Sequence, residues 1–192
     1  SAESAAGDFG TVRRPVAHGS GAPVTHLLSN GHYAVMLTAA GGGYSRWGDI
    51  AVTRWREDAT REDWGSFLFA RDAHTGLTWS PTAQPIDGGS AEREVVFGED
   101  HAEFVHRDSG LTSTVEIVVS AEHDGEVRRI SLANAGRRSR EIELTSYSEL
   151  VLATPAADNA HPAFARMFVQ TEYLPECGAL LATRRLRTPG ER

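Results

Sequence analysis

Residues 30–47 read NGHYAVMLTAAGGGYSRW, and this stretch decides the fold class. Its first part, Tyr33 to Thr38, has the alternating pattern of a half-buried β-strand. The three glycines 41–43 then allow a sharp chain reversal at little steric cost. We therefore predict a hairpin that presents Tyr44, Ser45 and Arg46 towards a neighbouring domain, with a purely local turn as the alternative.

Further short β-rich runs follow at intervals of roughly 8 to 15 residues, and glycine-containing turns separate them. No window shows a long helical period. This spacing predicts an all-β fold, a large antiparallel two-sheet sandwich, because parallel strands need crossovers of about a dozen residues or more. The ten expected strands are 33–38, 50–55, 66–71, 94–97, 102–107, 111–119, 127–132, 141–152, 164–173 and 179–185.

Composition narrows the class of protein further. The 192 residues suit a single domain, and the formal net charge of −7 without a basic block makes nucleic acid an unsuitable partner. No apolar run reaches the roughly 20 residues of a membrane helix. The single cysteine, Cys177, has no partner for an internal disulfide, which suits a reducing cytoplasm. All 19 basic residues are arginine, which indicates a GC-rich bacterial genome.

Three sequence blocks together resemble one known family. Besides residues 30–47, these are WSPTAQP at 79–85 and the run from Glu143 to Glu172 that includes Asp158, His161 and Phe164. The blocks resemble glycoside hydrolase family 94, the cellobiose and chitobiose phosphorylases once classed as glycosyltransferase family 36, in the form found in cyclic β-1,2-glucan synthases. The likeness covers residues 24–187. Residues 1–23 are expected to be a linker and 188–192 an exit linker.

The resemblance implies a specific architecture and role. The region is similar to the amino-terminal sandwich of these enzymes, a supersandwich of the galactose mutarotase type, which precedes a helical catalytic barrel. The general acid and the phosphate site belong to that barrel, so we expect no catalytic residue, cofactor or metal here. The expected partners are a β-glucan or gluco-oligosaccharide, the barrel itself and a second subunit. We expect the domain to lie in the cytoplasm and not to contact a membrane. This expectation also covers a parent protein that is anchored in the inner membrane.

Two other functions remain open from the sequence. One is a free-standing mutarotase-like or glycosidase sandwich, which would need its own acid and base from His161, Asp158 and Glu172. The other is an autonomous carbohydrate-binding module. Its binding platform would consist of Trp47, Trp64, Phe164 and Phe168.

Aromatic side chains beside planar polar groups mark candidate sugar contacts, because sugars present apolar ring faces and paired hydroxyls. On this ground the candidates are Tyr44, Arg46, Trp47 and Gln84, whereas Trp55 and Trp79 are expected mainly in the core.

A second group of candidates lies in the expected strand 164–173, whose parity places Phe164, Arg166 and Phe168 on one face. The family resemblance implies that Arg166 reaches the acceptor sugar of an adjacent subunit, although Ala165 stands where the phosphorylases have glutamine. The alternative is an arginine that covers the sheet edge or pairs with Glu172.

Overall fold

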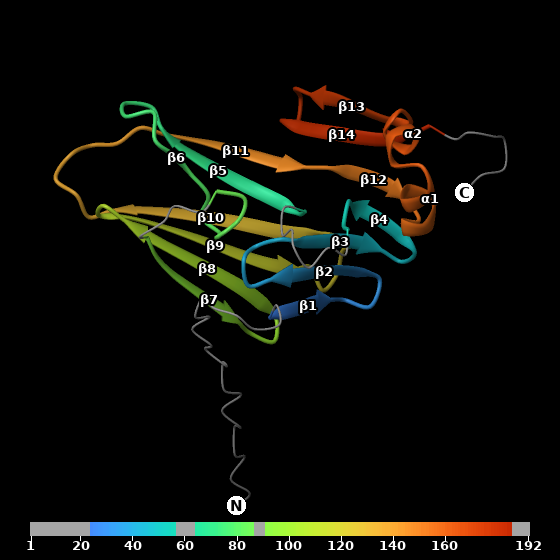
Figure 1. Ribbon diagram of the computed structural model, residues 1–192, viewed down its shortest axis with the longest axis horizontal. Helices are drawn as coiled ribbons and strands as arrows, with labels where there is room; N and C mark the ends of the chain where they lie inside the picture. The colour runs from blue at the N-terminus through green and yellow to red at the C-terminus, as the bar shows by residue number, and fades with distance from the viewer. Residues whose placement is uncertain (1–23, 57–63, 87–90, 186–192) are drawn as a thin grey trace, which may run out of the picture.

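The computed structural model describes residues 24–56, 64–86 and 91–185, and Figure 1 shows them as packed antiparallel sheets with two short helices. Of these residues 56% are in strands and 7% in helices, which confirms the all-β prediction. The expected linkers at 1–23 and 188–192 lie outside the described residues. The strands are β1 Thr25–Ser29, β2 Tyr33–Thr38, β3 Gly43–Trp47, β4 Ile50–Thr53, β5 Ser66–Asp72, β6 Thr78–Trp79, β7 Glu92–Phe97, β8 His101–Asp108, β9 Leu111–Val119, β10 Glu126–Asn134, β11 Ile142–Ser148, β12 Leu150–Ala153, β13 Val169–Leu174 and β14 Ala179–Arg184. The helices are α1 Pro155–Ala160 and α2 Pro162–Arg166.

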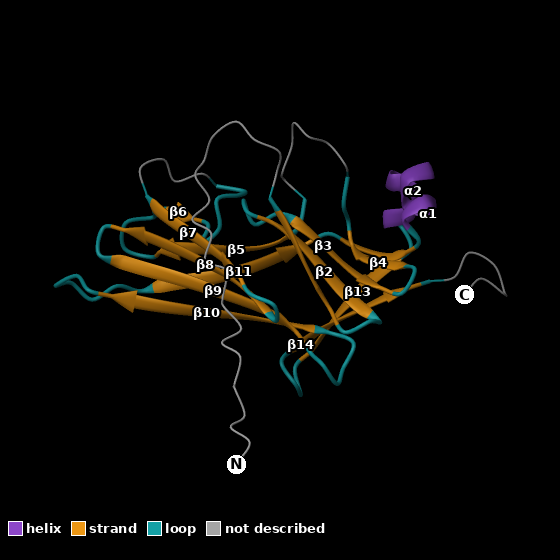
Figure 2. Cartoon of the chain, turned by 90° about the horizontal axis from the view of Figure 1, so that it is seen from below, coloured by secondary structure: helices purple, strands orange, loops and turns teal. Residues whose placement is uncertain are grey.

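The strands form four antiparallel ladders. Their orders are β1-β2-β3-β4-β12, β10-β9-β8-β7, β11-β5-β6 and β13-β14. β11 and β12 follow one another across Glu149 yet belong to different ladders, so the chain changes sheet at that residue. Both helices lie together at one end of the molecule, beside β4 and β12 (Figures 1 and 2).

The four-stranded sheet packs against two of the other ladders, whereas β13 and β14 contact β12. The inner face of the four-stranded sheet meets β1 and β2 in the larger core cluster, which includes Val35, Phe104 and Ile117. It meets the three-stranded sheet through a smaller cluster that includes Trp79 and Leu111, and the Trp79 indole donates a 3.3 Å hydrogen bond to Ser113 Oγ. Trp79 therefore belongs to the core, as the sequence indicated.

Three of the expected elements differ from the structure. Residues 164–173 do not form one strand, because α2 occupies the start and β13 begins at Val169. Residues 141–152 form two strands and not one. Residues 44–46 do not lie at a hairpin tip, because they are inside β3, where Ser45 is buried. β1, β3 and β6 were not among the expected strands, and β6 has only two residues.

Burial of two histidines makes stability depend on pH. The ring of His26 stacks on Phe97 with centroids 4.8 Å apart, and burial lowers the pKa of His26. Burial, with the nearby Arg93 charge, also lowers the pKa of His106. Below about pH 6.5 these two histidines become protonated in the unfolded chain but stay neutral in the folded chain. The free energy of unfolding should therefore decrease progressively as the pH falls.

We therefore expect the unfolding free energy to decrease between pH 7 and pH 5, and His26→Phe to reduce this slope because phenylalanine keeps the stacking without titrating. Urea unfolding at several pH values measures the slope. The exposed His74 provides the control through His74→Gln. An unchanged slope in His26→Phe would show that other groups cause the dependence.

Candidate functional site

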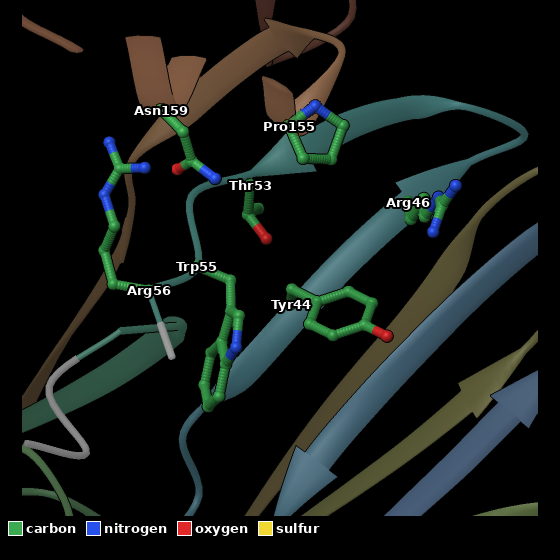
Figure 3. A pocket seen from close by; sticks show the side chains of 7 residues that line it. All are labelled: Tyr44, Arg46, Thr53, Trp55, Arg56, Pro155 and Asn159. Atoms are coloured by element: carbon green, nitrogen blue, oxygen red, sulfur yellow. The ribbon is translucent and has the colours of Figure 1, made fainter. Parts of the chain in front are cut away.

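A pocket of about 490 Å³ opens between β3, the end of β4 and α1. Strand alternation places Tyr44 and Arg46 on the same side of β3, which is the side that faces this pocket. α1 begins at Pro155, after Thr154 caps it with a 3.4 Å hydrogen bond from Ala157 N–H. The lining residues are Tyr44, Arg46, Thr53, Trp55, Arg56, Pro155 and Asn159 (Figure 3).

The pocket combines aromatic and polar groups. The rings of Tyr44 and Trp55 meet edge to face, with centroids 6.0 Å apart and planes inclined at 62°. In Figure 3 the amide of Asn159 points from α1 towards the hollow above these rings. Such a surface can contact the apolar face of a flat ligand and hydrogen-bond its polar edge.

A network of ion pairs lies next to the pocket and holds its walls. The guanidinium of Arg54, 2% exposed, binds Asp158 through two hydrogen bonds of 3.0 and 2.8 Å and Glu149 through one of 2.6 Å. Arg56 donates a further 2.9 Å bond to Asp158. The network thereby joins β4, α1 and the point where the chain changes sheet.

The surroundings shift the pKa of Arg54 and of the neighbouring Tyr147. The hydrogen bond with Asp158 raises the pKa of Arg54, so this arginine stays charged. Partial desolvation raises the pKa of Tyr147, which is 49% exposed, and the neighbouring Glu149 charge adds to the effect. Tyr147 therefore remains a neutral phenol, and its hydroxyl donates to Glu149 at 3.3 Å.

The predicted grouping of Phe164, Arg166 and Phe168 is wrong, because residues 162–166 are helical. Phe168 lies in the turn after α2, and its ring packs edge to face against that of Phe164 with centroids 5.0 Å apart. Arg166 instead donates a 2.9 Å hydrogen bond to Glu149. The guanidinium over the Phe168 ring, at 5.6 Å, is that of Arg184.

The alternative partner proposed for Arg166 is also corrected. Arg166 forms its ion pair with Glu149 and not with Glu172, which lies exposed on β13. Ala165, the residue that departs from the family pattern, is 1% exposed. The side chain at that position therefore points into the protein.

The remaining candidates lie apart from the pocket. Trp47 is 51% exposed, and its indole donates a 2.7 Å hydrogen bond to Asp124 in a separate hollow at the β3–β4 turn. Gln84 belongs to the loop after β6, where its N–H donates to Ala40 at 2.8 Å. Trp64 precedes β5, and its carbonyl accepts from Gly43 at 2.8 Å. The structure thus brings Tyr44 and Arg46 together and leaves the others elsewhere.

The pocket also contains residues that were not predicted as sugar contacts. Trp55 was expected mainly in the core, and Arg56 was not singled out as a candidate. Asn159 and Pro155 were missed because no helix was expected there. A signal for this helix was present, since Thr154 before Pro155 is a typical helix start.

The residues of the hypothetical free-standing glycosidase are not arranged as an acid and a base. Asp158 is 3% exposed and accepts three guanidinium hydrogen bonds. His161 is exposed at the junction of the two helices. Asp158 therefore serves as a structural anion in this fold.

Membrane-spanning helices and clustered metal ligands are both missing from the described part of the chain. Within residues 24–56, 64–86 and 91–185, no helix is both long and apolar enough to cross a membrane. The same residues contain no group of three or more His, Cys, Asp or Glu side chains that could hold a metal ion.

Comparison with known proteins identifies the family. The family model described as "Glycosyl hydrolase 94, supersandwich domain" matches residues 11–192. The chain is 48% identical to the cyclic beta-(1,2)-glucan synthase NdvB of Rhizobium meliloti (strain 1021) over 167 residues, which are 87% of this chain and 6% of the synthase. It is 26% identical over 159 residues to the N,N'-diacetylchitobiose phosphorylase of Vibrio furnissii, covering 79% of this chain and 20% of that enzyme.

These matches cover most of this chain but only a small part of each relative. The match to NdvB and the match to the family agree with the antiparallel sandwich seen here. The chain belongs to glycosyl hydrolase family 94, as a supersandwich domain of that family.

Proposed function

We propose that this domain is non-catalytic and serves a longer cyclic β-1,2-glucan synthase or related glycoside phosphorylase. It would support the acceptor side of the active site and take part in contacts between subunits. The observation that carries the proposal is the 48% identity to NdvB over 87% of the chain. The structural role of Asp158 supports it as well, because this carboxylate is 3% exposed and accepts hydrogen bonds from Arg54 and Arg56.

The partners in this proposal are a β-glucan or gluco-oligosaccharide, a carboxyl-terminal helical catalytic barrel and a second subunit. The domain would lie in the cytoplasm, also where the parent protein is anchored in the inner membrane. Arg166 is the proposed contact to the acceptor sugar. Its side chain is 56% exposed, and its pairing with Glu149 holds it at the surface of α2.

The proposal is tested with Arg166→Ala in the longer enzyme that carries this domain. Loss of one or two charge-assisted hydrogen bonds should lower the acceptor specificity constant roughly 10- to 150-fold, or about 1.5 to 3 kcal/mol. The melting temperature should change little, since exposed ion pairs contribute less than about 1 kcal/mol.

Arg129→Ala is the matched control, because Arg129 is an exposed arginine that pairs with Glu116 on the four-stranded sheet. This variant should keep its acceptor kinetics. If Arg166→Ala leaves acceptor kinetics unchanged but lowers the melting temperature strongly, Arg166 is structural and the proposed acceptor contact is wrong.

A further inference from the structure

The pocket between β3, β4 and α1 has no role in the proposal above, which concerns Arg166. Its volume of about 490 Å³ falls within the range of roughly 300 to 1,000 Å³ that small-molecule sites occupy. Its lining comes from three elements, and two of them are far apart in the sequence. The pocket is therefore formed by the tertiary fold and not by a single loop.

The aromatic wall favours a ligand with a flat apolar face. Tyr44 and Trp55 are only partly buried, so each leaves ring surface at the pocket. Pro155 adds a further apolar surface from α1. Together these groups would cover the C–H face of a pyranose ring and displace its water.

The polar groups favour a neutral ligand over an anion. Arg46 donates from Nε to the Gly48 carbonyl at 2.6 Å and from Nη2 to Asp49 at 3.3 Å. Arg56 is paired with Asp158 at 2.9 Å. Each guanidinium thus already has a carboxylate partner, while its several N–H groups can still orient hydroxyls at the pocket.

The pocket is also fixed before a ligand arrives. Thr53 Oγ1 accepts a 2.8 Å bond from Ser45 N–H, which ties β4 to β3. Asp158 on α1 is bound to both Arg54 and Arg56 beside β4, which holds α1 against the strands. Pre-organisation of this kind lowers the entropy cost of binding.

We propose that this pocket is a secondary binding site for a neutral gluco-oligosaccharide, which it holds by stacking a glucosyl ring on Trp55 and Tyr44 while Asn159 and Arg46 contact its hydroxyls. The choice of a glucan ligand rests on the proposed function, but the site is distinct from Arg166. Because the pocket is open and covers only part of a sugar chain, its affinity is weak, with a dissociation constant in the millimolar range, roughly 1 to 20 mM.

The test is an NMR titration of this chain with a β-1,2-linked glucose oligosaccharide. The Trp55 indole N–H signal and the backbone signals around Tyr44 and Asn159 should shift saturably. Trp55→Ala should weaken binding by about tenfold or more, since an aromatic stacking contact is lost. Tyr173→Ala removes an exposed aromatic side chain on β13 that does not line the pocket, and it should leave the titration unchanged.

Asn159→Ala is the second variant, because Asn159 is exposed on α1 and its replacement should not disturb folding. It should weaken binding several-fold. Three outcomes would overturn the proposal: no saturable shift up to about 50 mM sugar, equal losses in Tyr173→Ala and Trp55→Ala, or stronger binding of inorganic phosphate at the same signals. The last outcome would identify an anion site.

Failure of the pocket proposal can be distinguished from failure of the proposed function. Arg166→Ala should leave this titration unchanged, because Arg166 is bonded to Glu149 and does not line the pocket. Conversely, Trp55→Ala in the longer enzyme should affect affinity for long glucans more than turnover of a short acceptor. Loss of short-acceptor turnover in Trp55→Ala would show that the pocket is part of the acceptor site itself, which would overturn its assignment as a secondary site.

Discussion

Arg54→Ala is expected to destabilise the folded chain by about 3 to 5 kcal/mol, because it leaves a buried carboxylate without its main counter-charge. Arg54 and Asp158 are 2% and 3% exposed, and two hydrogen bonds join them. Arg56 alone would then compensate Asp158, and Glu149 would lose a 2.6 Å partner. Urea unfolding followed by circular dichroism gives the free energy.

Two further variants make this prediction sharper. Arg107→Ala removes an arginine that is 41% exposed in its side chain and pairs with Glu92 and Glu94, so it should cost less than about 1 kcal/mol. The double variant Arg54→Met with Asp158→Leu leaves no uncompensated Asp158 and should be more stable than Arg54→Ala. A loss of under about 1 kcal/mol for Arg54→Ala would contradict the role of the network.

Gly43→Ala is expected to cost about 3 kcal/mol or more, through both sterics and backbone strain. Gly43 has φ of +147°, and an added Cβ would lie 1.9 Å from the carbonyl oxygen of Met36 on the paired strand. β2 and β3 would have to separate, and with them the strand that carries Tyr44 into the pocket.

The matched control for this substitution is Gly31→Ala. Gly31 also has a positive φ, +95°, but nothing lies within 4 Å of the position that a Cβ would take there. It should lose only about 1 kcal/mol from the left-handed backbone. Thermal unfolding of both variants separates the steric clash with Met36 from the backbone strain of a positive φ. Equal losses of stability would show that Met36 moves aside without measurable loss of stability.

Much of the fold could be predicted from local patterns. The alternation in β2 and the turn glycines identified an antiparallel sandwich, because strand faces and chain reversals are encoded by neighbouring residues. These features depend on short stretches of sequence. Tyr44 and Arg46 were chosen as candidates by their side-chain chemistry, whereas their common side of β3 was not predicted, because no strand was expected there.

The predictions failed where the element type was misjudged. Parity was applied to residues 164–173 as if they were a strand, but Pro162 begins a helix that ends at Arg166. In the structure Arg166 pairs with Glu149, while the rings of Phe164 and Phe168 pack against each other. The pairing of Arg54 with Asp158 could not be predicted at all, since it joins residues 104 positions apart and depends on tertiary packing.

The same separation determines when the Arg54 network can form during folding. Its two contacts close loops of 95 and 104 residues, so the chain must already have brought β4, α1 and the sheet change at Glu149 together. Contacts between residues so far apart in the sequence have a high entropic cost of loop closure. We therefore expect them to form after the folding transition state. The network therefore stabilises the folded state after the folding transition state has been passed. Arg54→Ala should mainly accelerate unfolding in stopped-flow measurements and leave the refolding rate nearly unchanged.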